Sequence, residues 1–285
     1  MILVSGATGT VGRPLVDLLL TEGADVRALT RNRSSAGLPD GVEVVEGDPS
    51  RPETVADSLD GVTALFLHPR AVGDAAFEMV ELARAAGVRR VVALSAANID
   101  DDPAEQPSRF RGDRNLEAEQ AAVDSGLEWT SLRVGSFAVN TIGMWGQQIQ
   151  AGDVVRYVYA GFAESFIHER DMAAVAARAL LTDEVVGRRL VLTGPESLTH
   201  AEAVAVIGDV LGRQLHFHEI TPQQAVARMT DHGFPESFVT VLMARYATYA
   251  TTPQLPPTGD VESVLGRPAL SYAQWVADHA AAFRA

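Results

Sequence analysis

The stretch from Gly6 to Gly12 limits the fold of this chain more than any other segment. Its seven residues, Gly-Ala-Thr-Gly-Thr-Val-Gly, follow the apolar run Met1–Val4. The next residues, Arg13–Leu20, carry apolar side chains at helical spacing. An ordinary turn between a strand and a helix needs only one glycine, whereas this segment has three. The pattern predicts a buried strand, a glycine-rich loop and a helix, in that order.

A loop of this kind is suited to binding a dinucleotide. Glycine lets the backbone turn tightly and approach a pyrophosphate, and the N-terminus of the following helix offers free N–H groups and the positive end of its dipole. We therefore expect the following loop residues to contact the cofactor: Gly6, Thr8, Gly9, Thr10, Val11 and Gly12.

Strand and helix patterns alternate through the first half of the chain. Further strands are predicted at 24–29, 42–46, 62–67, 91–95 and 127–132, and helices at 52–59, 74–86 and 114–125. This order is typical of a parallel sheet covered by helices on both faces, which binds ligands at the carboxyl ends of its strands. We predict an α/β fold, a doubly wound parallel Rossmann sheet with a smaller C-terminal α+β substrate lobe.

The second half has a different pattern. Strands are predicted at 154–159, 189–192 and 216–220, helices at 170–181, 199–211, 222–232, 236–250 and 272–283, and an ordered proline-rich loop at 251–258. We expect residues 1–134 to form the NADP-binding domain, with 165–193 returning to it, and 135–285 to form mainly the substrate lobe.

Lysine and cysteine are both absent from the 285 residues, and all 23 basic side chains are arginines. The missing lysine excludes a Schiff base, a phosphate-binding P-loop and a Tyr-x-x-x-Lys catalytic pair. The missing cysteine excludes disulfides, thiolate catalysis and cysteine-based metal sites. His216 and His218 lie on one strand face, but no clear third ligand accompanies them, so we expect no metal.

The net charge of −14 opposes binding to nucleic acid and to anionic membranes. No apolar run approaches the ~20 residues that span a bilayer, and no signal peptide is apparent. We expect a soluble cytoplasmic protein.

The end of the predicted second strand indicates which nucleotide binds. NAD-selective folds place an acidic residue there, whereas this chain has Arg31 and Arg33. Guanidinium groups suit a 2′-phosphate, so we predict NADP(H), with Arg33 alternatively a solvated loop residue. Asp48 follows the third strand, where it can contact the adenine or cap the next helix.

Together these motifs resemble those of the NmrA-like branch of the atypical short-chain dehydrogenase/reductases. The resemblance covers nearly the whole chain and rests on Gly6–Gly12, Leu29–Arg31, Gly47–Asp48, Ala85–Val88, Val92–Ser95, Ser125–Thr130, Leu132–Arg133, Phe137, Asn140, Asp171–Ala173, Leu192–Pro195, Leu265–Pro268 and Gln274–Val276. It implies an NADPH-dependent reductase of quinones or related conjugated molecules, or else an NADP sensor that acts through a partner protein.

The chain departs from the reductase pattern at two places. Aligning Glu119 with the family's helix glutamate puts Asn115 where Lys or His often stands, and Arg111 at the position of a catalytic tyrosine. Another register puts Arg109 and Asp113 there. The usual Arg-Pro-Gly is here Arg133-Val134-Gly135. Alcohol dehydrogenase chemistry, which needs a Tyr–Lys acid, is therefore not expected.

The pocket is expected past the ends of the fourth to sixth strands. Catalytic candidates are Ser95, Arg111 and Asn115; Leu67, His68, Ser95, Gly135 and Phe137 are expected near the cofactor; Phe137, Asn140 and Trp145 are expected near the substrate; Ser136 also lies in this region. Structural alternatives stay open: His68 and Ser95 can simply end strands, and Arg111 can lie on the surface.

Two main functions remain open from the sequence. Hydride addition to a quinone gives a weakly basic hydroquinonate, which needs no strong positioned acid, so an oxidoreductase acting on a conjugated acceptor is the first hypothesis. A non-catalytic NADP sensor with a protein partner is the second, and an isomerase or lyase that uses bound NADP is a third. The oligomeric state is left open.

Overall fold

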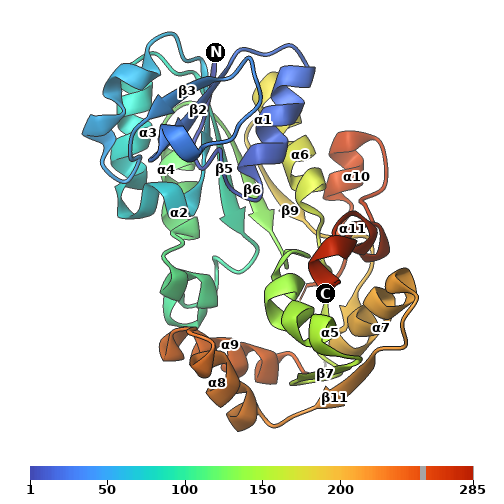
Figure 1. The fold of residues 1–285 in the computed structure, drawn as a ribbon. Helices are drawn as coiled ribbons and strands as arrows, with labels where there is room; N and C mark the ends of the chain where they lie inside the picture. The colour runs from blue at the N-terminus through green and yellow to red at the C-terminus, as the bar shows by residue number, and fades with distance from the viewer. Residues whose placement is uncertain (251–254, 285) are drawn as a thin grey trace.

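A seven-stranded parallel sheet forms the centre of the molecule (Figure 1). The computed structural model describes residues 1–250 and 255–284. The strands are β1 (Ile2–Val4), β2 (Val26–Thr30), β3 (Glu43–Glu46), β4 (Ala64–Leu67), β5 (Arg90–Ala96), β6 (Glu128–Val134) and β9 (Arg188–Leu192). Their order is β3-β2-β1-β4-β5-β6-β9, and every neighbouring pair is parallel. The predicted α/β fold with a doubly wound parallel sheet is confirmed.

Helices cover both faces of this sheet. Helices α1 (Gly12–Thr21) and α6 (Glu169–Leu181) pack on one face, and α3 (Ala76–Ala85) and α4 (Asn115–Asp124) pack on the other. Alternate strand residues face the two layers: Val4 joins the core beneath α1, whereas Leu3 joins the core beneath α3. The centre of the sheet is therefore buried on both sides, and its strands β1 and β4 are apolar throughout.

The C-terminal lobe has a hydrophobic core of its own. Strands β7 (Val154–Tyr157) and β11 (His216–Glu219) pair in parallel, and β8 (Ala163–Glu164) and β10 (Leu198–Thr199) pair antiparallel. Around them lie α5 (Gln147–Ala151), α7 (His200–Leu211), α8 (Pro222–Asp231), α9 (Glu236–Thr248) and α11 (Tyr272–Asp278). Large buried side chains such as Phe162 and Trp275 fill this core.

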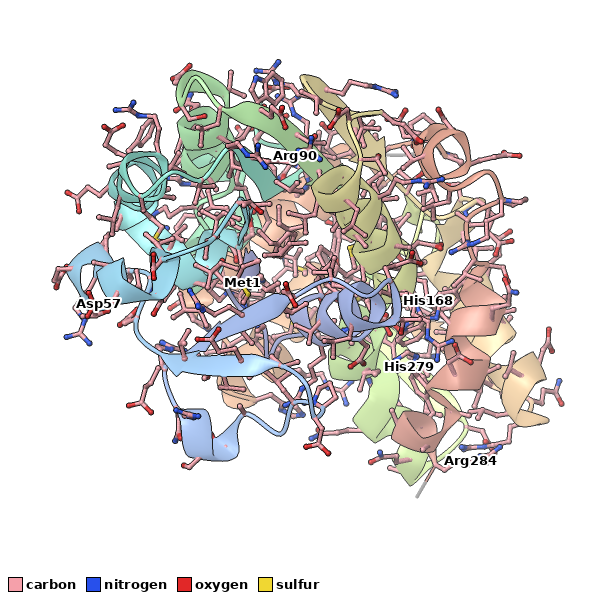
Figure 2. The ribbon with its side chains drawn as sticks, turned by 90° about the horizontal axis from the view of Figure 1, so that it is seen from above. Met1, Asp57, Arg90, His168, His279 and Arg284 are labelled. Carbon is pink, nitrogen blue, oxygen red and sulfur yellow. The ribbon has the colours of Figure 1, made fainter. Side chains whose placement is uncertain are left out.

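Late segments of the chain return to the sheet. Strand β9 pairs with β6, and α10 (Asp260–Leu265) packs on α6 and β9. Helix α11 is tied to the start of α6: Nε2 of His168 lies 3.2 Å from Oδ2 of Asp278, and Nε2 of His279 lies 2.9 Å from Oε1 of Glu169. Figure 2 shows the two histidines side by side, with ring centroids 5.8 Å apart. The domain boundary at 134 stays a prediction.

Several short elements differ from expectation. The predicted helix at 52–59 is wrong, because the segment forms two separate 3₁₀ turns, η2 (Pro52–Thr54) and η3 (Ala56–Leu59). Its β-branched, Asp and Ser residues are poor helix formers, and Val55 and Leu59 anchor it to the sheet. The sequence also did not indicate α2 (Pro69–Val72) or the π-helix η7 (Ile142–Gly146). The remaining 3₁₀ turns are η1 (Arg33–Ser35), η4 (Gly73–Ala75), η5 (Pro103–Glu105), η6 (Pro107–Arg111) and η8 (Ala280–Phe283).

The predicted proline-rich loop falls partly at 251–254, which lies outside the described residues. Beyond it, the backbone N–H of Thr258 donates to Oγ1 of Thr193 at 2.8 Å. No helix within 1–250 or 255–284 combines the length and apolar character needed to cross a membrane.

Candidate active site

Each of the three glycines in the first loop is needed for a different structural reason. Gly6 has a φ of +66°, which disfavours any side chain. A Cβ on Gly12 would lie 2.1 Å from the carbonyl oxygen of Gly6, so α1 approaches the loop too closely for alanine. A Cβ on Gly9 would meet only that same oxygen, at 3.2 Å, and would otherwise stand in open space. Gly9 therefore leaves room for a ligand, whereas Gly6 and Gly12 shape the loop.

The N-terminus of α1 is available to an anion. No side chain caps it, and its first turn contains no acidic residue. The adjoining residues Thr8, Gly9, Thr10 and Val11 line a cavity of about 1030 Å³. This arrangement of free N–H groups, positive helix end and glycine surface fits a pyrophosphate.

That cavity brings together most of the predicted site residues. It lies at the carboxyl ends of the parallel strands and extends into the C-terminal lobe. Fourteen nominated residues line it: Gly6, Thr8, Gly9, Thr10, Val11, Arg31, His68, Ser95, Arg111, Asn115, Gly135, Ser136, Phe137 and Asn140. Ordinary ligand pockets have volumes of about 300–1,000 Å³. This cavity is at the upper end of that range, so it has room for a dinucleotide beside a second small molecule.

The end of the cavity near β2 carries the groups expected to select the nucleotide. Arg31 is exposed on its wall, and Asn32 and Ser35 line it as well. Arg13 of α1 holds this wall in place by donating to the carbonyl oxygens of Ala36 at 2.6 Å and Gly37 at 2.7 Å. The loop after β2 is thereby fixed against the glycine loop.

Four residues predicted to contact the cofactor are not on the cavity wall: Gly12, which packs against the loop, and Arg33, Leu67 and Asp48. Arg33 is exposed and outside the cavity wall, and Leu67 is fully buried in the core beneath α3. The carboxylate of Asp48 accepts hydrogen bonds from Ser50, which with Arg51 hold its pKa below the usual value. Asp48 therefore organises its own turn, and the neighbouring Pro49 lines the cavity instead.

The position of Trp145 does not support its predicted role as a substrate wall. Its indole is completely buried in the core of the lobe, with ring centroids 6.2 Å from Tyr157 and 5.7 Å from His200. The π-turn at 142–146 rotates this residue inward, and residues 143 and 144 line the cavity instead. Phe137, by contrast, is half-buried on the cavity wall.

Ser95 and Asn115 meet at the centre of the cavity. The hydroxyl of Ser95, at the end of β5, donates to the backbone oxygen of Asn115 at 3.3 Å. Asn115 is the first residue of α4, and its side chain donates through Nδ2 to Oγ of Ser108 at 3.2 Å. Arg111 lies over the rings of Phe234 and Phe238 at 6.0 and 5.5 Å. Arg111 and Asn115 thus both line the cavity, whereas Arg109 pairs with Glu117.

His68 faces the cavity next to the glycine loop. A Cβ on Gly6 would lie 2.9 Å from its ring, so the imidazole packs directly on that glycine. Burial lowers the pKa of His68 by more than the negative charge of Asp113 raises it, so the ring is neutral at neutral pH. Within the described part of the chain its Nδ1 is buried without a hydrogen-bond partner.

The lobe contributes a second set of polar groups, of which the sequence indicated only Ser136. The hydroxyl of Ser136 donates to Oε1 of Glu164, and Nε2 of the fully buried His200 lies 3.4 Å from Oε2 of the same carboxylate. Ser136, Glu164, Tyr157 and Tyr246 all line the cavity. Burial raises the pKa values of both tyrosines, so their phenols stay protonated.

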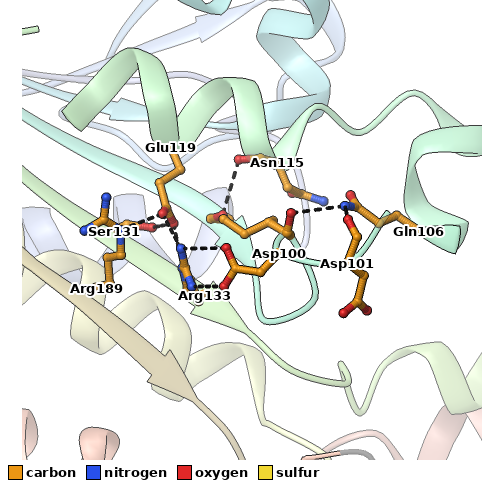
Figure 3. Close-up of polar contacts among 10 residues, drawn as sticks. Asp100, Asp101, Gln106, Asn115, Glu119, Ser131, Arg133 and Arg189 are labelled. Carbon is orange, nitrogen blue, oxygen red and sulfur yellow. Dashed lines mark hydrogen bonds and ion pairs between the residues drawn. The ribbon is translucent and has the colours of Figure 1, made fainter. Parts of the chain in front are cut away.

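Glu119 joins α4 to the sheet just behind this centre (Figure 3). Its carboxylate accepts hydrogen bonds from Ser131, from Arg133 at 2.6 and 2.9 Å, and from Arg189 at 2.8 Å. Burial alone would raise its pKa, but these hydrogen bonds hold the pKa below the usual value. Because Asn115 lies one turn earlier on α4, this network positions it relative to the end of β6.

Sequence reasoning missed the residues of α8, of α9 and of the turn between them that line the cavity: Ala225, Arg228, Met229, His232, Phe234, Phe238, Leu242, Arg245 and Tyr246. The helical patterns were visible, but no motif indicates which helix face meets a distant sheet. Among the described residues, no three His, Asp or Glu side chains gather closely enough to hold a metal ion.

Comparison with known proteins places this site in a family. A model described as NAD(P)H-binding matches residues 6–183. The chain is 36% identical over 286 residues to a (4-alkanoyl-5-oxo-2,5-dihydrofuran-3-yl)methyl phosphate reductase of Streptomyces griseus, with 99% of each chain covered. It is 32% identical over 290 residues to the NAD(P)H azoreductase of Xenophilus azovorans, with 100% of each chain covered.

The fold also matches a solved structure, the NADPH-dependent quinone oxidoreductase of Escherichia coli in complex with NADPH. The TM-score is 0.83 at 21% identity, covering 98% of this chain and 99% of that one. The predicted cofactor class, NADP(H), and the predicted reductase class are confirmed by the family match and the full-length relatives. The chain thus belongs to the NAD(P)H-binding family, within the NmrA-like branch of the atypical short-chain dehydrogenase/reductases.

Proposed function

We propose that this protein reduces a quinone or a similarly conjugated small molecule with NADPH. One observation carries the proposal: a single cavity runs from the glycine loop and Arg31 to a lobe wall that contains Phe137, Tyr246 and Phe238. Aromatic walls suit a planar acceptor stacked beside a nicotinamide. The two full-length relatives, whose names describe the reduction of an azo compound and of an unsaturated lactone phosphate, support an acceptor with conjugated multiple bonds.

When bound, NADPH supplies the hydride, and the chain supplies binding, orientation and a proton. The loop around Gly9 and the N-terminus of α1 hold the pyrophosphate, and Arg31 pairs with the 2′-phosphate. Ser95 and Asn115 are proposed to orient the acceptor and to stabilise the oxyanion that forms on it.

Protonation of that oxyanion is assigned to the lobe. Nε2 of His200 lies 3.4 Å from Oε2 of Glu164, and this carboxylate lines the cavity, so the two groups are placed to pass a proton toward it. The hydroxyl of Ser136 connects them to the cavity, because it can donate to the oxyanion and recover a proton from Glu164. A hydroquinonate needs only this weak assistance, because it is far less basic than an alkoxide.

The assay that tests this function is NADPH oxidation with a panel of quinones. We expect oxidation to depend on the acceptor, with a primary isotope effect from only one of the two stereospecifically deuterated forms of NADPH. Simple ketones and secondary alcohols serve as controls and are expected to be poor substrates, since the described centre offers no Tyr–Lys pair. Tight NADPH binding without oxidation by any quinone would favour the alternative of an NADP sensor.

Nucleotide selectivity gives a separate test. Replacing Arg31 with Asp should weaken NADPH binding by roughly 1.5–3 kcal/mol, because a charge-assisted bond to the 2′-phosphate is lost and a like charge is introduced. NADH binding should barely change. Arg33→Asp is a matched control, since it alters the net charge equally from outside the cavity wall. Equal wild-type dissociation constants for NADPH and NADH, measured calorimetrically, would contradict the assignment.

A further inference from the structure

The cavity carries a charge opposite to that of the whole protein. The chain has a net charge of −14, yet six arginines and only two carboxylates line the cavity: Arg31, Arg70, Arg111, Arg156, Arg228 and Arg245, with Asp113 and Glu164. In an acidic protein, a concave surface rich in guanidinium groups concentrates anionic ligands.

Half of these arginines have another role. Arg31 lies at the end assigned to the 2′-phosphate. Arg70 forms two hydrogen bonds with Asp113, at 3.0 and 2.6 Å. Arg245 pairs with Asp101 at 2.7 Å. These three cations are therefore already committed to the cofactor or to a carboxylate.

The other three, Arg111, Arg156 and Arg228, form no ion pair with any side chain of residues 1–250 or 255–284. Arg111 rests on the faces of two phenylalanines, which orient its guanidinium without neutralising it. Arginine remains charged at any pH at which the protein folds. All three side chains are exposed and line the cavity, so they are accessible to an anion that enters it.

Their positions bring them to the same end of the cavity. Arg156 on β7 and Arg228 on α8 both also line a second, smaller hollow of about 490 Å³, so these two residues border the same space; Glu219 lines that hollow as well but forms no ion pair with either arginine among the described residues. Arg111 ends η6, which packs against α9, and it contacts the two phenylalanines that follow α8. Figure 1 shows α8, α9 and β7 gathered at the end of the molecule farthest from α1.

The cofactor does not need these groups. Its pyrophosphate is assigned to the glycine loop and α1, and its 2′-phosphate to Arg31. Arg111 lies over Phe234 and Phe238, and all three arginines line the same cavity as these two rings and Tyr246. A ligand that satisfies both features has a planar ring system and an anionic group.

We propose that Arg111, Arg156 and Arg228 form an anion subsite that binds a phosphate or sulfonate group on a planar conjugated acceptor. One planar guanidinium fork is enough for a carboxylate, whereas cations from three separate elements match a group with three terminal oxygens. This inference rests on the proposed function in one respect: the ligand of the subsite is taken to be the acceptor that the enzyme reduces.

Binding tests the subsite without turnover. Naphthyl phosphate and naphthol are titrated calorimetrically into the enzyme saturated with NADP⁺, so that the cofactor's own phosphate sites are filled. We expect the phosphate to bind at least ~10-fold more tightly, the scale of one charge-assisted bond. Arg228→Gln should remove most of this preference. Arg89→Gln, at an exposed position outside the cavity, controls for net charge and should leave it unchanged.

Turnover separates this proposal from the proposed function. The ratio of kcat/KM for naphthoquinone sulfonate to that for naphthoquinone is compared between wild type and Arg228→Gln, which cancels the difference in reduction potential. We expect the ratio to fall by roughly 10-fold in the variant. Arg156→Gln should act in the same direction.

Reduction of both quinones with an unchanged ratio, together with equal binding of naphthyl phosphate and naphthol, would overturn the subsite and leave the reductase function standing. Binding of naphthyl phosphate that depends on Arg228, in a protein that reduces no quinone, would support the subsite and overturn the reductase function.

Discussion

Gly9→Val is expected to weaken NADPH binding by at least ~100-fold, the equivalent of losing two charge-assisted hydrogen bonds. The new side chain would project into the space between the loop and the pyrophosphate, because a Cβ there meets only the carbonyl oxygen of Gly6, at 3.2 Å. That single contact is relieved by a small shift, so the protein should fold with near-wild-type stability. Titration of the variant with NADPH, alongside thermal unfolding, checks both parts.

Gly12→Ala is the informative contrast. Its Cβ would lie 2.1 Å from the carbonyl oxygen of Gly6, a clash between backbone elements. This substitution should destabilise the fold by about 3 kcal/mol, at the upper end for overpacking. If Gly9→Val bound NADPH as the wild type does, the loop would be a structural turn and the pyrophosphate site would have to lie elsewhere.

Glu119→Gln is expected to destabilise the protein by about 3 kcal/mol, the scale for breaking a buried charge pair. The carboxylate is 3% exposed and accepts hydrogen bonds from Arg133 and Arg189 as well as Ser131. Loss of its charge leaves Arg189 without a carboxylate, whereas Arg133 retains Asp100 at 2.7 Å. Urea denaturation of the wild type and the variant measures the difference.

The pH dependence gives an independent check. Because the pKa of Glu119 is lower in the folded state, its stabilisation is present above its ordinary pKa of about 4.3 and is lost as pH falls through the folded value. The gap between wild type and variant should therefore close in acid. Asp100→Asn is the matched control: it also removes one partner of Arg133, but from an exposed position, and should cost less than about 1 kcal/mol. Equal effects of the two substitutions would argue against the buried network.

The parallel sheet could be predicted because the apolar strands, the glycines at helix ends and the order of the elements all indicated the same structure. Strands such as 91–95 are apolar on both faces, and glycines end the helices between them, so their order determines the architecture. The cofactor half of the cavity was predictable for the same reason: Gly9 lies in the loop after β1, Arg31 follows β2, and Ser95 lies near the end of β5. The carboxyl ends of parallel strands meet at one edge of the sheet.

The other half of the cavity was not predictable from local patterns. Trp145 was expected on the wall but points into the core, because one π-turn changes the side-chain direction in a way that no periodicity reveals. Glu164 and Arg228 come from a two-residue strand and from a helix far along the chain. Their convergence depends on how the lobe packs against the sheet, which a single sequence does not encode in any short motif.

The shared wall of the cavity also links ligand occupancy to the cooperativity of unfolding. Phe137 packs against the core of the sheet, and Tyr246 belongs to the core of the lobe, yet both border the same space. A cofactor at 100 times its dissociation constant adds about 2.7 kcal/mol to the free energy of unfolding. Because walls from both cores enclose this cavity, we expect a ligand that fills it to act as a non-covalent connection between them, so that the two cores melt together.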